Sequence, residues 1–184
     1  MASETEHTIL ISPIGDIPER ISDTIAQKTA HFFHVKTTVA PLLSDIQFAH
    51  DTERNQYHST VILERLAERC PDKAIRVVAV TLEDLFIPIL THVYGEAQLG
   101  GKACIVSICR LTIGPDLGGM DGGTERIVKE ALHELCHTFD LRHCKDPQCV
   151  MHYCRKIEDV DRKTGQLCRY CRIFLEDYFT LLDR

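Results

Sequence analysis

HELCHTFDLRH, residues 133–143, is the stretch on which the interpretation of this chain depends. His133 and His137 are four residues apart, so on a helix they project from one face, one turn apart. Two imidazoles placed in this way can hold one zinc ion, and His143 would add a third ligand while a coordination position stays open. Glu134 lies beside the first ligand and can reach a water on the metal without binding the metal itself. The pattern therefore predicts a catalytic zinc site with Glu134 as the general base.

A bare HExxH motif also occurs by chance, as an amphipathic helix with two surface histidines. The third histidine, at the extended spacing, disfavours that interpretation. The extended form HExxHxxGxxH, followed by a turn that contains methionine, is the signature of the metzincin metallopeptidases.

The residues that follow the third histidine narrow the assignment. Cys144, Cys149 and Met151 lie in HCKDPQCVM, and Cys168 and Cys171 lie in CRYC. This order closely resembles the archaemetzincins, a metzincin family with a second zinc site of four cysteines beside the catalytic one. The motifs cover about residues 124 to 172, and the upstream segments TLEDLFIPILTHVYGEAQLGG and RNQYHSTVILERL also resemble that family. The resemblance implies a metzincin-like fold, with Met151 as the methionine of the turn.

The four cysteines fit a structural zinc site. Zinc in a structural role prefers four thiolates in a closed tetrahedron, and the CxxC pair Cys168/Cys171 is a common half of such a site. Cys144 and Cys149 form the other pair. A redox role is the alternative for the CxxC pair, but no thioredoxin-like context surrounds it. We therefore expect two zinc ions per chain, one catalytic and one structural, and leave out Cys154, whose spacing matches no half-site better than Cys149 does.

One residue departs from the metzincin pattern. Asp140 stands where the pattern has glycine, at the point where the helix ends and the chain turns toward the third ligand. Glycine adopts the left-handed conformation without steric cost, and aspartate does so less readily, though more easily than most residues. We expect the turn to form with some strain.

Length and composition fit one globular domain over residues 1–184, with an upper part over about 1–139 and a lower, zinc-tied part over about 140–184. The chain is 44% hydrophobic and 26% charged, with a net charge of −6. An acidic chain without a basic cluster is a poor candidate for binding nucleic acid. We expect a monomer whose partner is a peptide or protein substrate.

The beginning of the chain, MASETEHTIL, has no basic segment followed by a long apolar one, and no stretch approaches the length of a membrane-spanning helix. These features predict a cytoplasmic protein without a membrane partner. Thiols stay reduced in that compartment, so the nine cysteines favour metal binding over disulfides.

Hydrophobic periodicity predicts an α/β (α+β) fold, in which a mixed, twisted sheet is flanked by helices. Residues 141–166 are polar and irregular, as expected of a loop held by metal. We expect strands at 7–14, 34–43, 75–81, 91–96 and 103–111, and helices at 17–33, 57–70, 125–139 (the active-site helix) and 169–183.

The hypothesis that follows is a zinc-dependent peptidase of the archaemetzincin type. Glu134 would take a proton from the zinc-bound water and pass it to the leaving amine. By resemblance to metzincins, a strand above the cleft, at 91–96 or 103–111, would pair with an extended peptide. The alternative is a zinc-stabilised peptide-binding protein with little or no peptidase activity. A purely structural histidine site has no need of a carboxylate at position 134, so Glu134 distinguishes the two.

Overall fold

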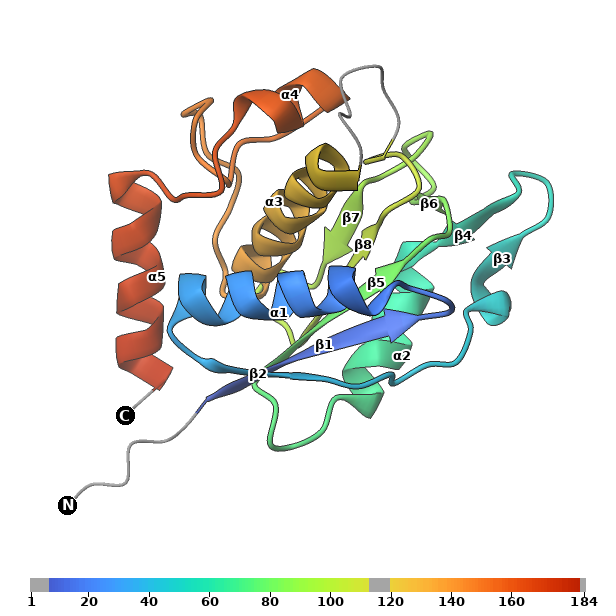
Figure 1. Ribbon diagram of the computed structural model, residues 1–184, viewed down its shortest axis with the longest axis horizontal. Helices are drawn as coiled ribbons and strands as arrows, with labels where there is room; N and C mark the ends of the chain where they lie inside the picture. Colours follow the sequence, from blue (N-terminus) through green and yellow to red (C-terminus); the bar gives the residue numbers. More distant parts are fainter. Residues whose placement is uncertain (1–6, 113–119, 183–184) are drawn as a thin grey trace.

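The computed structural model describes residues 7–112 and 120–182 and shows a central sheet with helices on both faces (Figure 1). The main sheet has five strands in the order β2-β1-β5-β8-β7. Neighbouring strands are parallel except for β7, which runs antiparallel to β8 at one edge. The strands are β1 (Thr8–Ile14), β2 (Lys36–Val39), β5 (Arg76–Thr81), β7 (Gly95–Ala97) and β8 (Ala103–Ser107). The predicted mixed α/β fold is thereby confirmed.

The alternation of side chains along the strands separates two hydrophobic clusters. Ile9 and Ile11 of β1 face the cluster that contains α1 (Glu19–Phe33) and α3 (Met120–Thr138). Leu10 and Ile14, between and beyond them, face the cluster that contains α2 (Ser59–Arg69). All six residues of β5 are buried, as expected of a central parallel strand covered on both sides. Helix α3, which contains the predicted active-site segment, therefore lies against one face of the sheet.

Several predicted strands are shorter or lie elsewhere. The second strand, expected at 34–43, is only Lys36–Val39, because Pro41 has no amide hydrogen with which to extend the ladder. The strand expected at 91–96 is placed wrongly: β7 comprises Gly95–Ala97, and turns precede it. The strand expected at 103–111 ends at Ser107, where the backbone turns and Leu111 N–H donates to Ile108 O.

Some elements escaped the sequence analysis. The predicted irregular stretch 141–166 contains a short helix, α4 (Ile157–Arg162), and α3 begins at Met120 rather than at 125. A second, three-stranded sheet has strands of two or three residues, too short to display a hydrophobic period. The final helix was correctly predicted, as α5. The remaining elements are the 3₁₀ turn η1 (Gln47–Ala49) and β3 (His50–Asp51), β4 (Gln56–His58), β6 (Leu85–Phe86) and α5 (Arg169–Leu182).

The chain beyond α3 folds back over that helix, with α4 across one end and α5 along the side of the molecule (Figure 1). Arg126 of α3 makes two short bonds to Asp161 of α4, Nε–Oδ1 at 2.6 Å and NH2–Oδ2 at 2.7 Å. At the other end of α3, Arg76 of β5 donates to Thr138 O and to the hydroxyl of Tyr178 in α5. These contacts join the segment after α3 to that helix and to the sheet. No helix in the described part of the chain is both long and apolar enough to cross a membrane.

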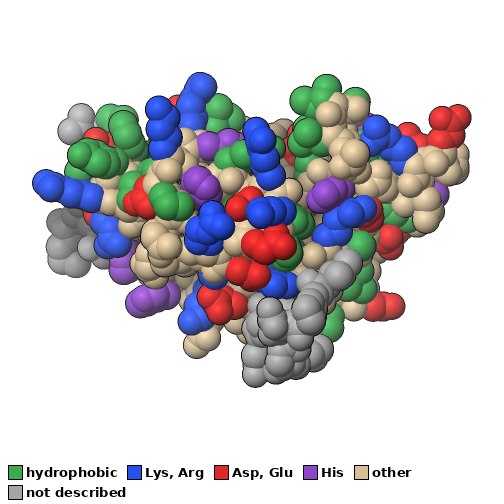
Figure 2. Space-filling model, turned by 90° about the horizontal axis from the view of Figure 1, so that it is seen from above, with side chains coloured by type: hydrophobic (Ala, Val, Ile, Leu, Met, Phe, Trp, Pro, Cys, Tyr) green, Lys and Arg blue, Asp and Glu red, His purple; other side chains and the backbone are tan. Residues whose placement is uncertain are grey.

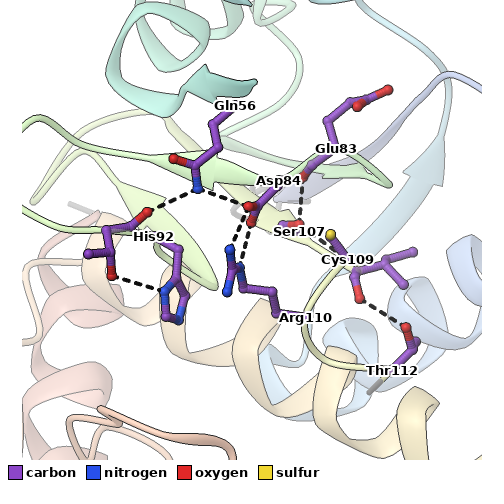
Figure 3. A network of polar contacts seen from close by, with 10 residues as sticks. Gln56, Glu83, Asp84, His92, Ser107, Cys109, Arg110 and Thr112 are labelled. Atoms are coloured by element: carbon purple, nitrogen blue, oxygen red, sulfur yellow. Dashed lines mark hydrogen bonds and ion pairs between the residues drawn. The ribbon is translucent and has the colours of Figure 1, made fainter. Parts of the chain in front are cut away.

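A polar network holds the chain that leads into β7 (Figure 3). Arg110 makes a bidentate ion pair with Asp84, with both N–O distances 2.7 Å. Gln56 Nε2 donates to the same carboxylate and to Thr91 O, at 2.8 and 2.9 Å. Ser107 at the end of β8 donates to Glu83 O at 2.6 Å. The turn before β6 and the segment before β7 are thus fastened to β4 and to the end of β8.

Asp84 should make the stability of the fold depend on pH. Burial alone would raise the pKa of this carboxyl, but hydrogen bonds from Arg110 and Gln56 hold the pKa below its usual value. The pKa of Asp84 is lower in the folded state than in the unfolded state. At pH values between the two, the unfolded state binds more protons, so the free energy of unfolding falls as pH drops. The contribution is complete above the unfolded pKa of about 3.9 and disappears as pH falls through the folded value.

Asp84→Asn should therefore lower the free energy of unfolding by about 1–3 kcal/mol at pH 7. The difference between variant and wild type should shrink as pH falls from 5 to 3, because the carboxyl of the unfolded wild type then binds a proton that the folded state binds less readily. Urea unfolding at pH 7, 5 and 3 measures both effects. A difference that grows toward acid pH would contradict the assignment.

Candidate functional site

The structure brings together the three histidines that the sequence singled out. One ring nitrogen from each of His133, His137 and His143 lies within 4.8 Å of the others. The ring centroids of His133 and His137 are 4.6 Å apart, and that of His143 lies 5.3 and 4.9 Å from them. The first two rings project from one face of α3 because they are four residues apart. The third comes from the segment after the helix.

Two backbone carbonyls fix which nitrogen of each helix histidine carries hydrogen. His133 Nδ1 lies 2.8 Å from Val150 O, and His137 Nδ1 lies 2.6 Å from Leu141 O. A carbonyl oxygen can only accept, so each Nδ1 must donate, and each neutral ring keeps an unprotonated Nε2. Those two Nε2 atoms are 3.1 Å apart. Two lone pairs at this distance repel each other unless a cation lies between them.

The spacing of these nitrogens fits zinc. Zn–N bonds of about 2.0–2.1 Å in a tetrahedron place two ligand nitrogens about 3.3 Å apart, close to the observed 3.1 Å. Burial lowers the pKa of His133 well below its usual value and lowers that of His137 to about 4. Both rings are therefore neutral at pH 7, the form that binds a metal. Burial also lowers the pKa of His143.

Asp140 forms the turn that leads to His143. Its φ is 65°, in the left-handed region that the metzincin glycine normally occupies. Asp140 N–H donates to His137 O, and Leu141 N–H donates to Cys136 O, at 3.0 and 3.2 Å. These two bonds make a Schellman motif, which ends the helix and satisfies its last carbonyls. Asp140 therefore adopts the left-handed turn conformation that the metzincin pattern assigns to glycine.

Glu134 lies beneath the edge strand of the sheet. Its side chain is 6% exposed, and burial raises its pKa well above the usual value, with the nearby charge of Glu130 raising it further. A Cβ atom at Gly95 of β7 would lie 2.7 Å from Glu134 Cγ and 2.7 Å from Ile105 O. Only glycine at position 95 therefore lets the strand pass directly over this carboxylate.

The four predicted cysteines also come together. One sulfur from each of Cys144, Cys149, Cys168 and Cys171 lies within 4.8 Å of the others. Cys144 Sγ and Cys168 Sγ are 3.8 Å apart. A disulfide would need about 2.05 Å, whereas Zn–S bonds of about 2.3 Å in a tetrahedron predict about 3.8 Å. The geometry of the thiols therefore matches a zinc tetrahedron and not a disulfide.

The turn after the cysteines carries the methionine that the sequence indicated. Met151 is fully buried in the same cluster as Leu135 of α3. Cys144 N–H donates to Met151 O at 2.8 Å, which closes the loop between them. Tyr153, which follows, has its ring 4.8 Å from that of His143 and is 43% exposed. Cys154 lies outside the four-sulfur group.

Sequence reasoning missed two charged residues beside the histidines. Glu130, one helical turn before Glu134, is 3% exposed and forms an ion pair of 2.7 Å with Lys163. The Lys163 ammonium also lies 3.5 Å from His133 Nδ1. The helical spacing of Glu130 could have placed it on the face of His133 and Glu134. Nothing in the local sequence indicates Lys163, because it directly follows the unpredicted helix α4 and reaches the site only through tertiary packing.

The fold and the site are those of a metallopeptidase of the metzincin class. The site combines two helix histidines with neutral rings, a third histidine from the following turn and a buried glutamate under an edge strand. Comparison with known proteins narrows this class. Peptidase family M54 matches residues 43–177. The chain is 33% identical to the archaemetzincin of Methanocaldococcus jannaschii, over 92% of this chain and 93% of that protein.

Solved structures agree with the sequence matches. The crystal structure of archaemetzincin from Methanopyrus kandleri superimposes with a TM-score of 0.84 at 31% identity, covering 98% of this chain and 99% of that one. A zinc-dependent peptidase from Methanocorpusculum labreanum gives a TM-score of 0.80 at 25% identity, covering 91% and 99%. The chain belongs to the archaemetzincins, peptidase family M54, and is a zinc metallopeptidase.

Gly95→Ala should damage activity more than the small change in size suggests. The new methyl group would collide with a backbone carbonyl as well as with Glu134, so strand or carboxylate must move. Such overpacking costs about 1–3 kcal/mol of stability, and a displaced Glu134 should lower kcat/KM by about 10–100-fold. Peptide cleavage and urea unfolding measure the two effects. Gly165→Ala, where a Cβ meets nothing within 4 Å, is the matched control. Full activity in Gly95→Ala would show that β7 does not constrain Glu134.

Proposed function

We propose that the two clusters hold two zinc ions per chain, with unlike roles. His133, His137 and His143 would bind the catalytic ion, and the four clustered cysteines would bind a structural one. The observation that supports the first assignment is the pair of unprotonated Nε2 atoms 3.1 Å apart, each held in place by a carbonyl on the other side of its ring. Three protein ligands leave the open position that a catalytic zinc requires, whereas four thiolates close the second site.

When bound at the histidines, zinc would act as a Lewis acid toward the substrate carbonyl and lower the pKa of a water nearby. Glu134 would take a proton from the attacking water and pass it to the leaving amine. Burial raises the pKa of Glu134, which suits this second step, because the protonated carboxyl is a good donor. A dication beside it favours the ionised form that the first step needs.

Substrate would bind as an extended peptide along β7. Of the two strands expected to have this role, β8 lies between β5 and β7 and has no free edge, whereas β7 is at the edge of the sheet. Ser107 N–H donates to Tyr94 O, and Gln98 N–H donates to Ala103 O. Because antiparallel bonding alternates, the backbone groups of Gly95 and Ala97 point away from β8. A peptide paired with them would lie beside Glu134.

The charge distribution agrees with a peptide substrate. Figure 2 shows basic and acidic side chains intermixed, with histidines among them, over the described part of the face that carries α4. This face therefore presents no continuous basic surface to a phosphate backbone. The net charge of −6 supports the same choice.

Elemental analysis of protein purified without chelators should find two zinc ions per chain. Cys168→Ser should reduce the count to one and lower Tm by on the order of 10 °C, because structural zinc contributes directly to folding free energy. His137→Ala should also leave one zinc but shift Tm by less. A single ion in the wild type, or a larger loss of stability in His137→Ala than in Cys168→Ser, would contradict the division of roles.

Glu134→Gln should reduce peptide cleavage by about 10²–10⁴-fold while the zinc content stays at the wild-type value. Glutamine keeps the shape of the side chain but cannot take a proton. Cleavage of a quenched peptide library, with metal content measured on the same samples, tests this. Glu64→Gln, on the exposed face of α2, is the control.

Two results would contradict the role of Glu134 as general base: a Glu134→Gln variant that cleaves at the wild-type rate, or one that loses its zinc. A fully metallated wild type that binds library peptides without cleaving them would favour a zinc-stabilised peptide-binding protein instead.

A further inference from the structure

A fully buried ion pair joins the active-site helix to the segment that follows α4. Lys163 Nζ lies 2.7 Å from Glu130 Oε1, and the two side chains are 0% and 5% exposed. Removing two charges from water costs several kcal/mol per ion, and apolar replacements for such pairs are often neutral or stabilising. Stability alone therefore gives a weak reason for this pair, and its position beside the histidines suggests another.

The ammonium does not act on His133 through a hydrogen bond. It lies 3.5 Å from His133 Nδ1, but that nitrogen already donates to Val150 O at 2.8 Å. Both groups at the longer contact are donors, so no hydrogen bond joins them. Any effect of Lys163 on the ring must come from its charge or from what it holds in place.

Backbone bonds connect Lys163 to the carbonyl that orients His133. The next residue, Thr164, donates to Gln148 O from both its amide and its hydroxyl, at 3.0 and 2.7 Å. Two residues further along, Val150 N–H donates to Gln166 O at 2.8 Å. Segment 163–166 is therefore bonded to segment 148–150, and the last residue of that segment supplies the carbonyl for His133.

We propose that Lys163 and Glu130 are a positioning pair for the metal ligand His133. The ion pair pins segment 163–166 to α3, which keeps Val150 O in line with His133 Nδ1 and directs Nε2 toward the metal. The 2.7 Å separation of Lys163 Nζ and Glu130 Oε1, with both side chains buried, carries this assignment. This inference rests on the proposed metal site at the histidines.

Lys163 could act on the metal site by its charge or by holding segment 163–166 in place, and these two roles predict opposite changes in zinc affinity when Lys163 is replaced. A cation close to a ligand ring repels a dication. If Lys163 acted only through its charge, its replacement would therefore strengthen zinc binding. If the ion pair instead positions the ligand, its loss would weaken zinc binding, because groups that orient a ligand typically account for about 10–100-fold in metal affinity. The direction of the change therefore separates the two effects.

The test is zinc affinity at the histidine site, measured by competition with a chelator, with the cysteine site of the same protein as internal reference. Lys163→Met should weaken binding at the histidines by about 10–100-fold and leave the cysteine site unchanged. Lys73→Met, on an exposed turn, should change neither. Unchanged or tighter binding at the histidines in Lys163→Met would overturn the proposal.

A second variant excludes a folding artefact, because Lys163→Met alone leaves the Glu130 carboxylate buried without its partner. Lys163→Met combined with Glu130→Met removes both charges and leaves the net charge of the site unchanged, so a loss of affinity there is not electrostatic. We expect the same 10–100-fold loss in this folded double variant, and wild-type affinity would overturn the inference. A wild type that holds zinc only at the cysteines would refute the metal site itself.

Discussion

The arrangement of the proposed metal site depends on two carbonyl oxygens that accept the ring hydrogens of His133 and His137. Val150 O and Leu141 O accept those hydrogens, so both Nε2 atoms face each other unprotonated at 3.1 Å. Neither helix geometry nor the HExxH motif can fix this tautomer, because each carbonyl belongs to the chain beyond the helix. The site exists only when that later segment is folded back against α3.

This requirement explains why the segment after α3 is so closely tethered. Asp140 reverses the chain immediately, with a Schellman motif at a φ of 65°. The cysteine cluster then ties the start of this segment to the start of α5, and Val150 and Met151 are fully buried between them. A loop with so little hydrophobic surface of its own needs such cross-links to become ordered, and the proposed zinc at the four cysteines would supply one.

The sequence could predict those parts of the site that depend on local spacing. A four-residue interval places His133 and His137 on one helix face whatever the rest of the chain does, and the CxxC pair comes from one tight turn in the same way. It could not predict Lys163 or Val150 O, because their roles depend on tertiary packing around the unforeseen helix α4. The strand expected at 91–96 was misplaced because only Gly95–Ala97 pair with β8, and the local sequence does not show where that pairing begins. The short strands β3 and β4 gave no periodic pattern to detect.

The charged residues on α3 show how the two parts of the molecule depend on each other. Arg126, Lys129 and Glu130 are all less than 7% exposed, although each would be costly to bury alone. Each has a partner contact with the segment beyond the helix: Asp161 for the first, Val160 O for the second and Lys163 for the third. If that segment detached, three charged side chains would lose these partners at the same time as the histidines lost their carbonyls. The contacts of the segment after α3 therefore support both these buried charges and the orientation of the histidines, so zinc affinity at the proposed histidine site should depend on contacts that involve no metal ligand.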